Sequence, residues 1–388
     1  MNILIFATTF GADLLSLCHF LSEKTDTEIK VLMKNVDGFR HEGIFSFWPL
    51  NVELIERKKH HHVSGVSGFK PDITILDNKI PLRPLSPKAL ILWHGYGWKG
   101  PNDEEEFKWM HRSIRLAWGD MKSPNPDIKW QCFGPVDYKH RTEVSGFHRE
   151  NCLKLGSASH DFLRRDIDKS KANPFYSFDI EEHKTVLFAP TWHYGEVFSH
   201  WGTDAELITR MIEDLDDRNV NVIMRMHDSF RFGDDYVQFL KNLEHEHPNV
   251  LVKFKDQHPD NFLDIQVADV MVTNFSSIAN LFYATGKPTV HIYPVKSEDE
   301  TFMWRQKTIL GVREKSVDSA RFIWKYPPED NGGLLARNFV EMMDQIHQGL
   351  ENPHCCDEQA KSYLNKHMLG ADGKNCERIW NAMQKLIG

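Results

Sequence analysis

Short apolar runs that alternate with helical patterns constrain the fold of this 388-residue chain more than any other feature. An apolar run bounded by turn residues is typical of a buried strand, and an amphipathic pattern is typical of a helix that covers a sheet. Repeated alternation of the two indicates βαβ units around parallel sheets. The runs that we expect to form strands are 2–8, 28–33, 72–77, 89–94, 185–192, 220–227, 249–254, 268–275 and 288–293.

The same alternation predicts an α/β fold with two Rossmann-like domains and mostly parallel sheets. A domain usually holds about 100–200 residues, so the length fits two domains. Residues 166–184 are polar and weakly patterned, and we interpret them as a linker between a domain over 1–165 and a domain over 180–388 with a helical C-terminal tail. Because such sheets bind ligands beyond the carboxyl ends of their strands, we expect the domains to face each other across a cleft.

Composition and charge exclude several classes of protein. The formal charge of −8 argues against a general nucleic-acid binder. Six cysteines without a CxxC pair indicate neither a zinc framework nor a disulfide scaffold, and we interpret them as reduced thiols of a cytoplasmic protein. No segment approaches the roughly 18 apolar residues that span a bilayer. The N-terminal apolar run lacks the basic region of a signal peptide and predicts a first strand.

Common nucleotide-binding and hydrolase motifs are absent as well. The sequence has no Walker A loop, no GxGxxG after the first strand and no GxSxG elbow. These absences argue against P-loop enzymes, Rossmann dehydrogenases and α/β-hydrolases. The acidic segment 101–107 contains no Asp-x-Asp pair, so it does not indicate a metal-bridged nucleotide site. We therefore expect neither a metal nor a cofactor.

The first of four strand-end motifs is WHGYGWKG at residues 93–100. His94 ends an expected strand and can accept a proton near neutral pH. The glycines that follow, such as Gly95, permit a close approach of the backbone, and Lys99 lies among them. The alternative is an ordinary loop histidine bonded to a neighbouring carbonyl.

Two further motifs place polar residues at the ends of strands. FAPTWHYGE carries Thr191, a possible donor to phosphate, and His193, although a turn defined by proline is the alternative. In VIMRMHDS, Arg225 and His227 alternate along a strand and therefore face the same way. A cation beside a histidine suits a developing anion, and the alternative is an exposed pair on an edge strand.

The fourth motif is ADVMVTNFSSIANLFYATGKPTVHIY. An apolar strand ends at Asn274, and Ser276 and Ser277 open a helix. Serine is a favoured N-cap, and the N–H groups at a helix start attract anions. Two hydroxyls at such a start would make a phosphate site that needs no metal. The alternative is an ordinary serine cap.

Taken together and in this order, the motifs resemble the CDP-glycerol glycerophosphotransferases, which build teichoic-acid and related polymers. The chain's LWHGYGWKG resembles the family's strand-end WHG, its FAPTWH resembles APTWR, and its MRMH resembles Arg-x-His. The ADVMVTNFSS segment resembles AD-(apolar)-TDYSS, and LGSASHDFL keeps Gly156 and Asp161 of the segment GxPRxD. The resemblance covers about residues 90–295, and five motifs in the right order make it specific.

The resemblance implies a GT-B fold with an acceptor-side domain over 1–165 and a nucleotide-donor domain over 180–388. It implies a transfer without a metal, in which an acceptor hydroxyl attacks the β-phosphorus of CDP-glycerol and CMP leaves. In this scheme His94 is the general base, while His227 and Arg225 stabilise the diphosphate. The candidate catalytic residues are His94 and His227, and the candidate substrate-binding residues are Gly95, Lys99, Thr191, His193, Arg225, Asn274, Ser276 and Ser277.

Departures from the family's pattern leave the donor open. Asn274 and Asn280 stand where the family usually has Asp, His193 replaces an arginine, and Ser159-His160 replaces Arg-Asn. Another CDP-alditol or a nucleotide sugar is therefore also a candidate donor. Two alternative functions follow: an inverting GT-B glycosyltransferase that uses a nucleotide sugar, and a nucleotide-binding module without catalysis.

Two weaker features concern the surface. ERKKHHH at residues 56–62 is interpreted as a solvated charged loop and not as a metal or membrane patch. Phe45, Phe47 and Trp48 would either dock on a bilayer or pack in a core, and packing is favoured. A role like the family's implies a cytoplasmic enzyme, peripheral at the inner face of the cell membrane, that acts on a polyol-phosphate, glycan or lipid-linked acceptor.

Overall fold

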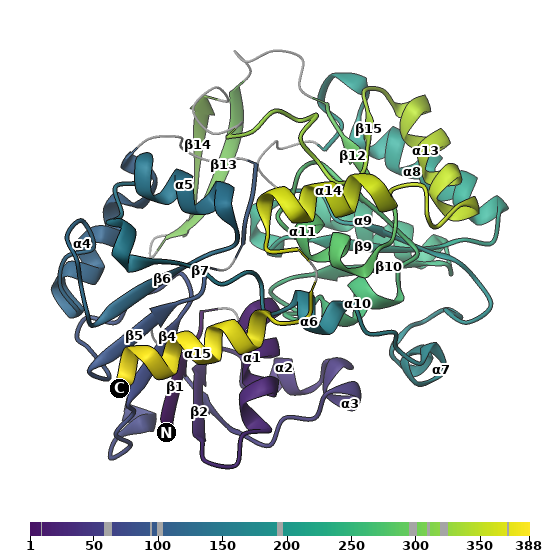
Figure 1. The fold of residues 1–388 in the computed structure, drawn as a ribbon. Helices are drawn as coiled ribbons and strands as arrows, with labels where there is room; N and C mark the ends of the chain where they lie inside the picture. Colours follow the sequence, from purple (N-terminus) through teal and green to yellow (C-terminus); the bar gives the residue numbers. More distant parts are fainter. Residues whose placement is uncertain are drawn as a thin grey trace. The chain divides into compact units, whose positions relative to one another are not determined.

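The computed structural model describes residues 1–8, 10–57, 64–93, 95–98, 104–191, 197–294, 301–308, 311–318, 325–370 and 372–388 (Figure 1). The chain forms two compact units, each with its own parallel sheet and helices. The predicted α/β class is therefore confirmed. The first unit consists of Met1–Tyr96, Asn102–Arg165 and Tyr363–Gly388, and the second consists of Gly97–Pro101 and Asp166–Ser362.

The first unit is built on a seven-stranded sheet with the order β3-β2-β1-β4-β5-β6-β7, and all its pairings are parallel. Residues Ile3 to Phe6 are completely buried, as expected for a central parallel strand covered on both faces. The strands are β1 (Asn2–Phe6), β2 (Glu28–Met33), β3 (Glu53–Glu56), β4 (Ile73–Leu76), β5 (Lys88–Ile91), β6 (Ile128–Cys132) and β7 (Cys152–Lys154). The helices are α1 (Ala12–Ser22), α2 (Val36–Arg40), α3 (Ile44–Phe47), α4 (Lys108–Ala117), α5 (Pro135–Glu143), α6 (His160–Leu163) and α15 (Asn375–Ile387).

The second unit is built on a six-stranded parallel sheet with the order β10-β9-β8-β11-β12-β15. Its strands are β8 (Thr185–Phe188), β9 (Asn221–Met226), β10 (Val250–Phe254), β11 (Val270–Thr273), β12 (Thr289–Ile292) and β15 (Leu334–Ala336). Its helices are α7 (Lys169–Ala172), α8 (Asp204–Asp217), α9 (Asp234–Glu246), α10 (Phe262–Val267), α11 (Ile278–Phe282) and α13 (Phe339–Glu351), and α14 (Asp357–His367) begins in this unit. The apolar faces of α8, α9 and α13 pack in one core with the sheet.

A two-stranded antiparallel hairpin follows β12 in the second unit. It consists of β13 (Thr301–Thr308) and β14 (Gly311–Asp318). The sequence pattern does not predict these strands, because they contain many charged residues and lack a continuous apolar run.

The C-terminal tail divides between the two units, whereas the sequence pattern predicts all of it in the second. Residues Tyr363–Gly388 belong to the first unit because Asp161 holds the start of α15. Its carboxylate accepts hydrogen bonds from the N–H groups of Asn375 (3.1 Å) and Cys376 (2.7 Å), which satisfies two unpaired donors of the helix. Gly156, with φ of +72°, is also required, because a Cβ there would lie 1.9 Å from Asn375 Oδ1.

The expected linker, 166–184, begins where the chain passes from the first unit to the second. It is not a free connection, since it contains α7 and groups with the second unit. Lys169 in α7 forms an ion pair with Asp269 at 3.3 Å. Part of this polar segment therefore pairs with a charged group of the second unit.

Candidate functional site

Three neighbouring strands of the second unit bring candidate residues to one edge of the sheet. Strand β8 pairs with β9 on one side and with β11 on the other, and all three run in the same direction. Phe188 at the end of β8 lies opposite Met224 and Val272. The segments that follow these strands therefore leave the sheet at its carboxyl edge, where α/β proteins bind ligands.

The structure brings Thr191 and Asn274 into direct contact at this edge. The Thr191 N–H donates to Asn274 Oδ1 at 2.5 Å, and Asn274 is completely buried. The residue before Asn274, Thr273, donates from its hydroxyl to the Ala189 carbonyl at 2.7 Å. The loop after β8 and the turn after β11 are therefore locked together by side chains of the fourth motif.

The turn after β11 contains an unusual backbone conformation. Phe275 has φ of +63°, which places a bulky residue in the left-handed region. This conformation costs roughly 1–2 kcal/mol for a residue other than glycine and persists only where the surroundings fix it. The turn directs the backbone N–H of Ser276 to Thr273 Oγ1, at 3.3 Å.

Ser276 and Ser277 follow this turn, and neither side chain acts as an ordinary cap. Ser277 occupies the N-cap position of α11, but its backbone is helical and its side chain makes no capping hydrogen bond. Ser276 is partly buried and Ser277 is exposed. Because α11 has five residues, the hydroxyls and turn N–H groups, and not a long helix dipole, are what this site offers to an anion.

His227 lies directly after β9 at the same carboxyl edge. Its Nδ1 lies 2.7 Å from the Asp228 N–H and 2.9 Å from Asp228 Oδ2. Burial lowers the pKa of His227, and Asp228 opposes this shift, while the nearby cations Lys255 and Arg231 add to it. Both contacts are made by Nδ1, so the neutral ring carries its proton on Nδ1 when it donates to Asp228 Oδ2 and on Nε2 when it accepts the Asp228 N–H; in the second form Nε2 can donate to a ligand.

Arg225 differs from its predicted role because its guanidinium is bound inside the unit. The strand β9 is an inner strand, and Arg225 is only 7% exposed, so the exposed edge pair is excluded. Its Nη1 pairs with Asp264 at 3.2 Å, and its Nη2 donates to the His258 carbonyl. These contacts favour a role in fixing the strand end beside His227.

The acid that holds Arg225 belongs to a buried charged cluster. Asp264 also accepts from Lys253 at 2.7 Å and from Tyr176 at 2.9 Å. Burial alone would raise the pKa of Asp264, but Lys253 and Arg225 outweigh it and hold the pKa below its usual value. In the nearby Asp260, burial dominates and raises the pKa to about 6. Local sequence pattern gave no sign of this cluster.

Three candidate residues, His94, Lys99 and His193, lie outside the described residues. The strand before His94 ends earlier than predicted, since β5 stops at Ile91 and the expected run extended to residue 94. Gly95 is partly buried, and Tyr96 is buried with its hydroxyl 2.8 Å from His367 Nδ1. The roles of the three residues remain predictions.

The departure from the family's pattern at Ser159-His160 lies in the interior of the first unit. The Ser157 and Ser159 hydroxyls donate to Asp13 Oδ1 at 2.5 and 2.8 Å, and His160 is completely buried. Within the first unit this change forms part of the packing around α1.

The structure also corrects the prediction for Arg57. It lies in ERKKHHH, which was predicted to be a solvated loop, yet Arg57 is 1% exposed. Its guanidinium donates to the Ala7 carbonyl at 2.8 Å and lies over the Phe6 ring. Residues 58–63 lie outside the described residues. The second residue of the charged run is therefore an arginine that holds the carboxyl end of β1.

The residues Phe45 and Trp48 are partly buried, which agrees with the favoured packing. The Phe45 ring lies 5.1 Å from Phe39, and Trp48 lies 5.6 Å from Phe162. In the described part of the chain, no helix is both long and apolar enough to cross a bilayer. All six cysteines are free, and the described His, Cys, Asp and Glu residues form no cluster of three that would suit a metal.

Comparisons with known proteins agree with the motifs. Residues 134–298 match the family described as CDP-Glycerol:Poly(glycerophosphate) glycerophosphotransferase. The chain is also 22% identical over 251 residues to the teichoic acid ribitol-phosphate polymerase TarK of Staphylococcus aureus strain NCTC 8325 / PS 47. That alignment covers 63% of this chain and 42% of TarK, so the chain matches less than half the length of this relative.

Solved structures agree on the fold. The wall teichoic acid polymerase TagF, as the H444N variant soaked with CDPG, has a TM-score of 0.68 at 12% identity and covers 100% of this chain and 89% of its own. The UDP complex of MnaA from S. aureus has a TM-score of 0.56 at 12% identity, with 99% and 95% covered. At these identities the likeness establishes the fold alone. With the match over residues 134–298, the resemblance of this chain to the CDP-glycerol glycerophosphotransferase family is confirmed.

Proposed function

We propose that this chain is a transferase that moves glycerol phosphate, or a similar alditol phosphate, from CDP-glycerol to an acceptor hydroxyl and releases CMP. The acceptor is a polyol-phosphate, glycan or lipid-linked molecule in the synthesis of a cell-surface polymer such as teichoic acid or capsule. The observation that supports this proposal most is the turn after β11, where Ser276 and Ser277 follow buried Asn274 and the Ser277 side chain does not cap its helix. This turn lies inside the segment that matches the family.

The proposed reaction is an attack of the acceptor oxygen on the β-phosphorus of the donor. The bond between the acceptor oxygen and this phosphorus forms, and the bond from phosphorus to the CMP oxygen breaks. His94 takes the proton of the acceptor hydroxyl, and CMP leaves as a phosphate anion. General-base help of this kind is typically worth about 10²–10⁴-fold in rate.

Residues of the second unit hold the diphosphate in this proposal. Ser276 and Ser277 donate hydrogen bonds to its oxygens, and Thr191 lies beside them through its bond to Asn274. Neutral His227 donates from Nε2 to the departing phosphate, because burial keeps its pKa below the usual value. Lys99 and His193, predicted from their motifs, would add donors from the two glycine-containing loops.

The side-chain amide of Asn274 affects which nucleotide-activated donor the site would bind. It accepts the Thr191 N–H as a carboxylate would, but it adds no negative charge next to a diphosphate. The turn therefore keeps its geometry and loses a source of repulsion toward anionic donors. This change is compatible with CDP-glycerol, with another CDP-alditol and with a nucleotide sugar.

Turnover of CDP-glycerol by histidine variants tests the proposed function. We expect His94→Ala and His227→Ala each to lower kcat by about 10²–10⁴-fold, because each removes a group that moves or donates a proton. Release of CMP is measured with a polyol-phosphate acceptor, after circular dichroism shows that each variant is folded. The matched control is His354→Ala, which removes a histidine whose side chain is 79% exposed. Rates near the wild type in both site variants would refute the proposed roles.

An inverting glycosyltransferase that uses a nucleotide sugar is the second candidate. Two observations support this alternative: the fold is similar to that of MnaA, which was solved with UDP, and the buried side chain of Asn274 carries no charge. In that reaction the attack falls on the anomeric carbon, so a nucleotide diphosphate leaves instead of CMP. A donor panel that detects CMP, UMP and UDP separates the two. Binding of CDP without turnover across the panel would instead support a module without catalysis.

A location at the inner face of the cell membrane is also proposed, since lipid-linked acceptors are found there. The partly buried Phe45 and Trp48 lend this contact no support, because both rings pack against aromatic side chains. Flotation of the protein with anionic vesicles, compared with neutral ones, measures it. Recovery in the soluble fraction under both conditions would contradict peripheral binding.

A further inference from the structure

Trp98 contacts the strained turn after β11. It is completely buried, and it belongs to the second unit although the preceding residues Met1–Tyr96 belong to the first. Its ring meets the Phe275 ring edge to face, with centroids 5.6 Å apart and planes at 77°. Phe275 is the residue with φ of +63° between Asn274 and Ser276.

The surroundings of Phe275 form an aromatic cluster that includes Trp98. His291 in β12 lies 4.6 Å from Phe275 and 5.4 Å from Trp98, measured between ring centroids. Tyr283 lies 6.4 Å from Trp98, and its hydroxyl lies 2.5 Å from His291 Nε2. Edge-to-face pairs stabilise a given ring orientation beyond the burial of their area. The cluster therefore fixes the orientation of the Phe275 ring.

Trp98 is held in place independently of that cluster. Its indole N–H donates to the Asp330 carbonyl at 2.7 Å, and its own carbonyl accepts the Lys325 N–H at 2.5 Å. A tryptophan fixed at its backbone and at its ring nitrogen is a rigid support. Left-handed backbone at a bulky residue persists only where such a support over-determines it.

We propose that Trp98 is a positioning residue for the donor site, because its contact with Phe275 keeps the Asn274–Ser277 turn in the conformation that presents both serines. This inference rests on the proposed function for the identity of the ligand. Trp98 follows the proposed base His94 by four residues in the sequence. No motif of the family resemblance assigned a role to Trp98.

Two substitutions at Trp98 test the proposal by their difference. Trp98→Phe keeps an aromatic ring that can meet Phe275, whereas Trp98→Leu fills the space without an aromatic edge. We expect Trp98→Leu to lower kcat/KM for CDP-glycerol by about 10- to 100-fold, mainly through a higher KM for the donor, because misplacement by about 1 Å has effects of this size. Trp98→Phe is expected to restore most of this loss. The KM for the acceptor should stay unchanged.

Hydrogen–deuterium exchange of backbone amides is a second measurement, and it does not depend on turnover. In Trp98→Leu, amides of residues 274–282 should exchange faster, while those of strands β8 and β9 keep the wild-type rate. Trp109→Ala in α4 is the control, since this tryptophan is 48% exposed and belongs to the first unit. Exchange at wild-type rates in Trp98→Leu, or a fall of kcat with an unchanged donor KM in both Trp98 variants, would overturn the proposal.

The two readings separate this inference from the proposed function. If the wild-type protein does not turn over CDP-glycerol, the proposed function fails, and the exchange experiment still decides whether Trp98 holds the turn. If turnover occurs but Trp98→Leu behaves like the wild type in both readings, only the positioning role fails.

Discussion

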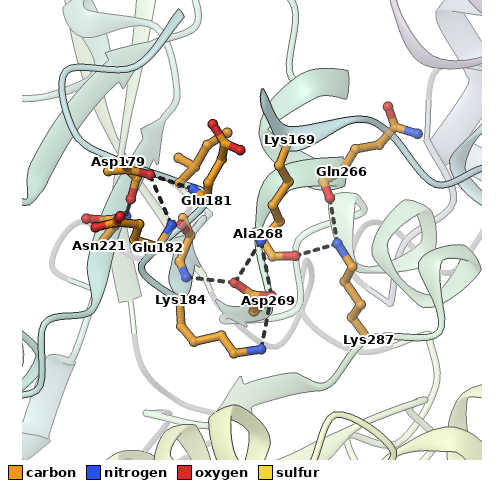
Figure 2. Close-up of polar contacts among 12 residues, drawn as sticks. Lys169, Asp179, Glu181, Glu182, Lys184, Asn221, Gln266, Ala268, Asp269 and Lys287 are labelled. Carbon is orange, nitrogen blue, oxygen red and sulfur yellow. Dashed lines mark hydrogen bonds and ion pairs between the residues drawn. The ribbon is translucent and has the colours of Figure 1, made fainter. Parts of the chain in front are cut away.

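The two edges of the sheet in the second unit contain similar polar residues and use them differently. At the amino edge, Lys169 and Lys184 lie 3.3 and 3.7 Å from the carboxylate of Asp269 (Figure 2). Asp269 also accepts the N–H of Thr185, the first residue of β8, at 2.9 Å. Lysines gathered at one edge would suggest a phosphate site by composition alone, yet here they share an internal carboxylate.

Lys287, also at the amino edge, is bound by backbone carbonyls of the protein. Its ammonium donates to the carbonyls of Gln266 and Ala268 at 2.5 and 2.7 Å, as Figure 2 shows. These carbonyls lie at the end of α10, where the helix leaves acceptors without an internal partner. Burial lowers the pKa of Lys287 to about 8, although Asp269 opposes the shift. Even in its neutral form the amine can donate to both carbonyls.

At the carboxyl edge, the Ser277 side chain is not bound within the protein in the way that the lysines of the amino edge are. Asn274 and Thr273 are used within the protein, but Ser277 is exposed and does not cap its helix. The difference teaches that residue type does not identify a binding site. A binding site is indicated where rigid neighbours hold hydrogen-bond donors in place but do not themselves accept the hydrogen bonds.

The largest effect on stability should follow the loss of the shared carboxylate at the amino edge. Asp269→Ala removes the acceptor of the Thr185 N–H and the counter-charge of two lysines. We expect the free energy of unfolding to fall by about 2–3 kcal/mol, below the value for a fully buried pair because the lysines are partly exposed. Urea denaturation measures this, and Glu181→Ala, an exposed acid in Figure 2, is the control.

The donor KM of Asp269→Ala, measured in the folded variant, should equal that of the wild type. A raised KM with unchanged stability would break the contrast between the two edges, since it would make the amino edge a ligand site.

The opposite pattern is expected for Ser277→Ala. The free energy of unfolding should stay within about 0.5 kcal/mol of the wild type, because the side chain is exposed and makes no capping hydrogen bond. The donor KM should rise about tenfold, the effect of one hydrogen bond to a charged group. Steady-state kinetics and urea denaturation of the same sample check both values. A loss of stability with an unchanged KM would make Ser277 a structural residue.

Much of the fold could be predicted from local sequence, for a physical reason. Strands β1, β8 and β11 lie at or within the expected runs because parallel strands covered on both faces need continuous apolar residues. The shared edge of Thr191 and Asn274 also follows from strand ends in parallel sheets, and their hydrogen bond confirms it. Periodicity is informative where burial depends on near neighbours in the chain.

Other features depend on contacts between distant residues and could not be predicted in this way. The tail returns to the first unit because Asp161 binds the N–H groups of Asn375 and Cys376, more than two hundred residues later. Arg57 is buried in a charged run because the Ala7 carbonyl accepts from it. Trp98 joins the second unit through Phe275 and Asp330. In each case the partner that decides the structure is absent from the local pattern.

The location of the donor is the central claim, and a crystal structure of the protein soaked with CDP-glycerol tests it most directly. The account predicts diphosphate oxygens within about 3.2 Å of the Ser276 and Ser277 hydroxyls or their N–H groups, at the carboxyl edge of the second sheet. A nucleotide bound instead beside Lys169 and Lys184 at the amino edge, with the serines unoccupied, would contradict it.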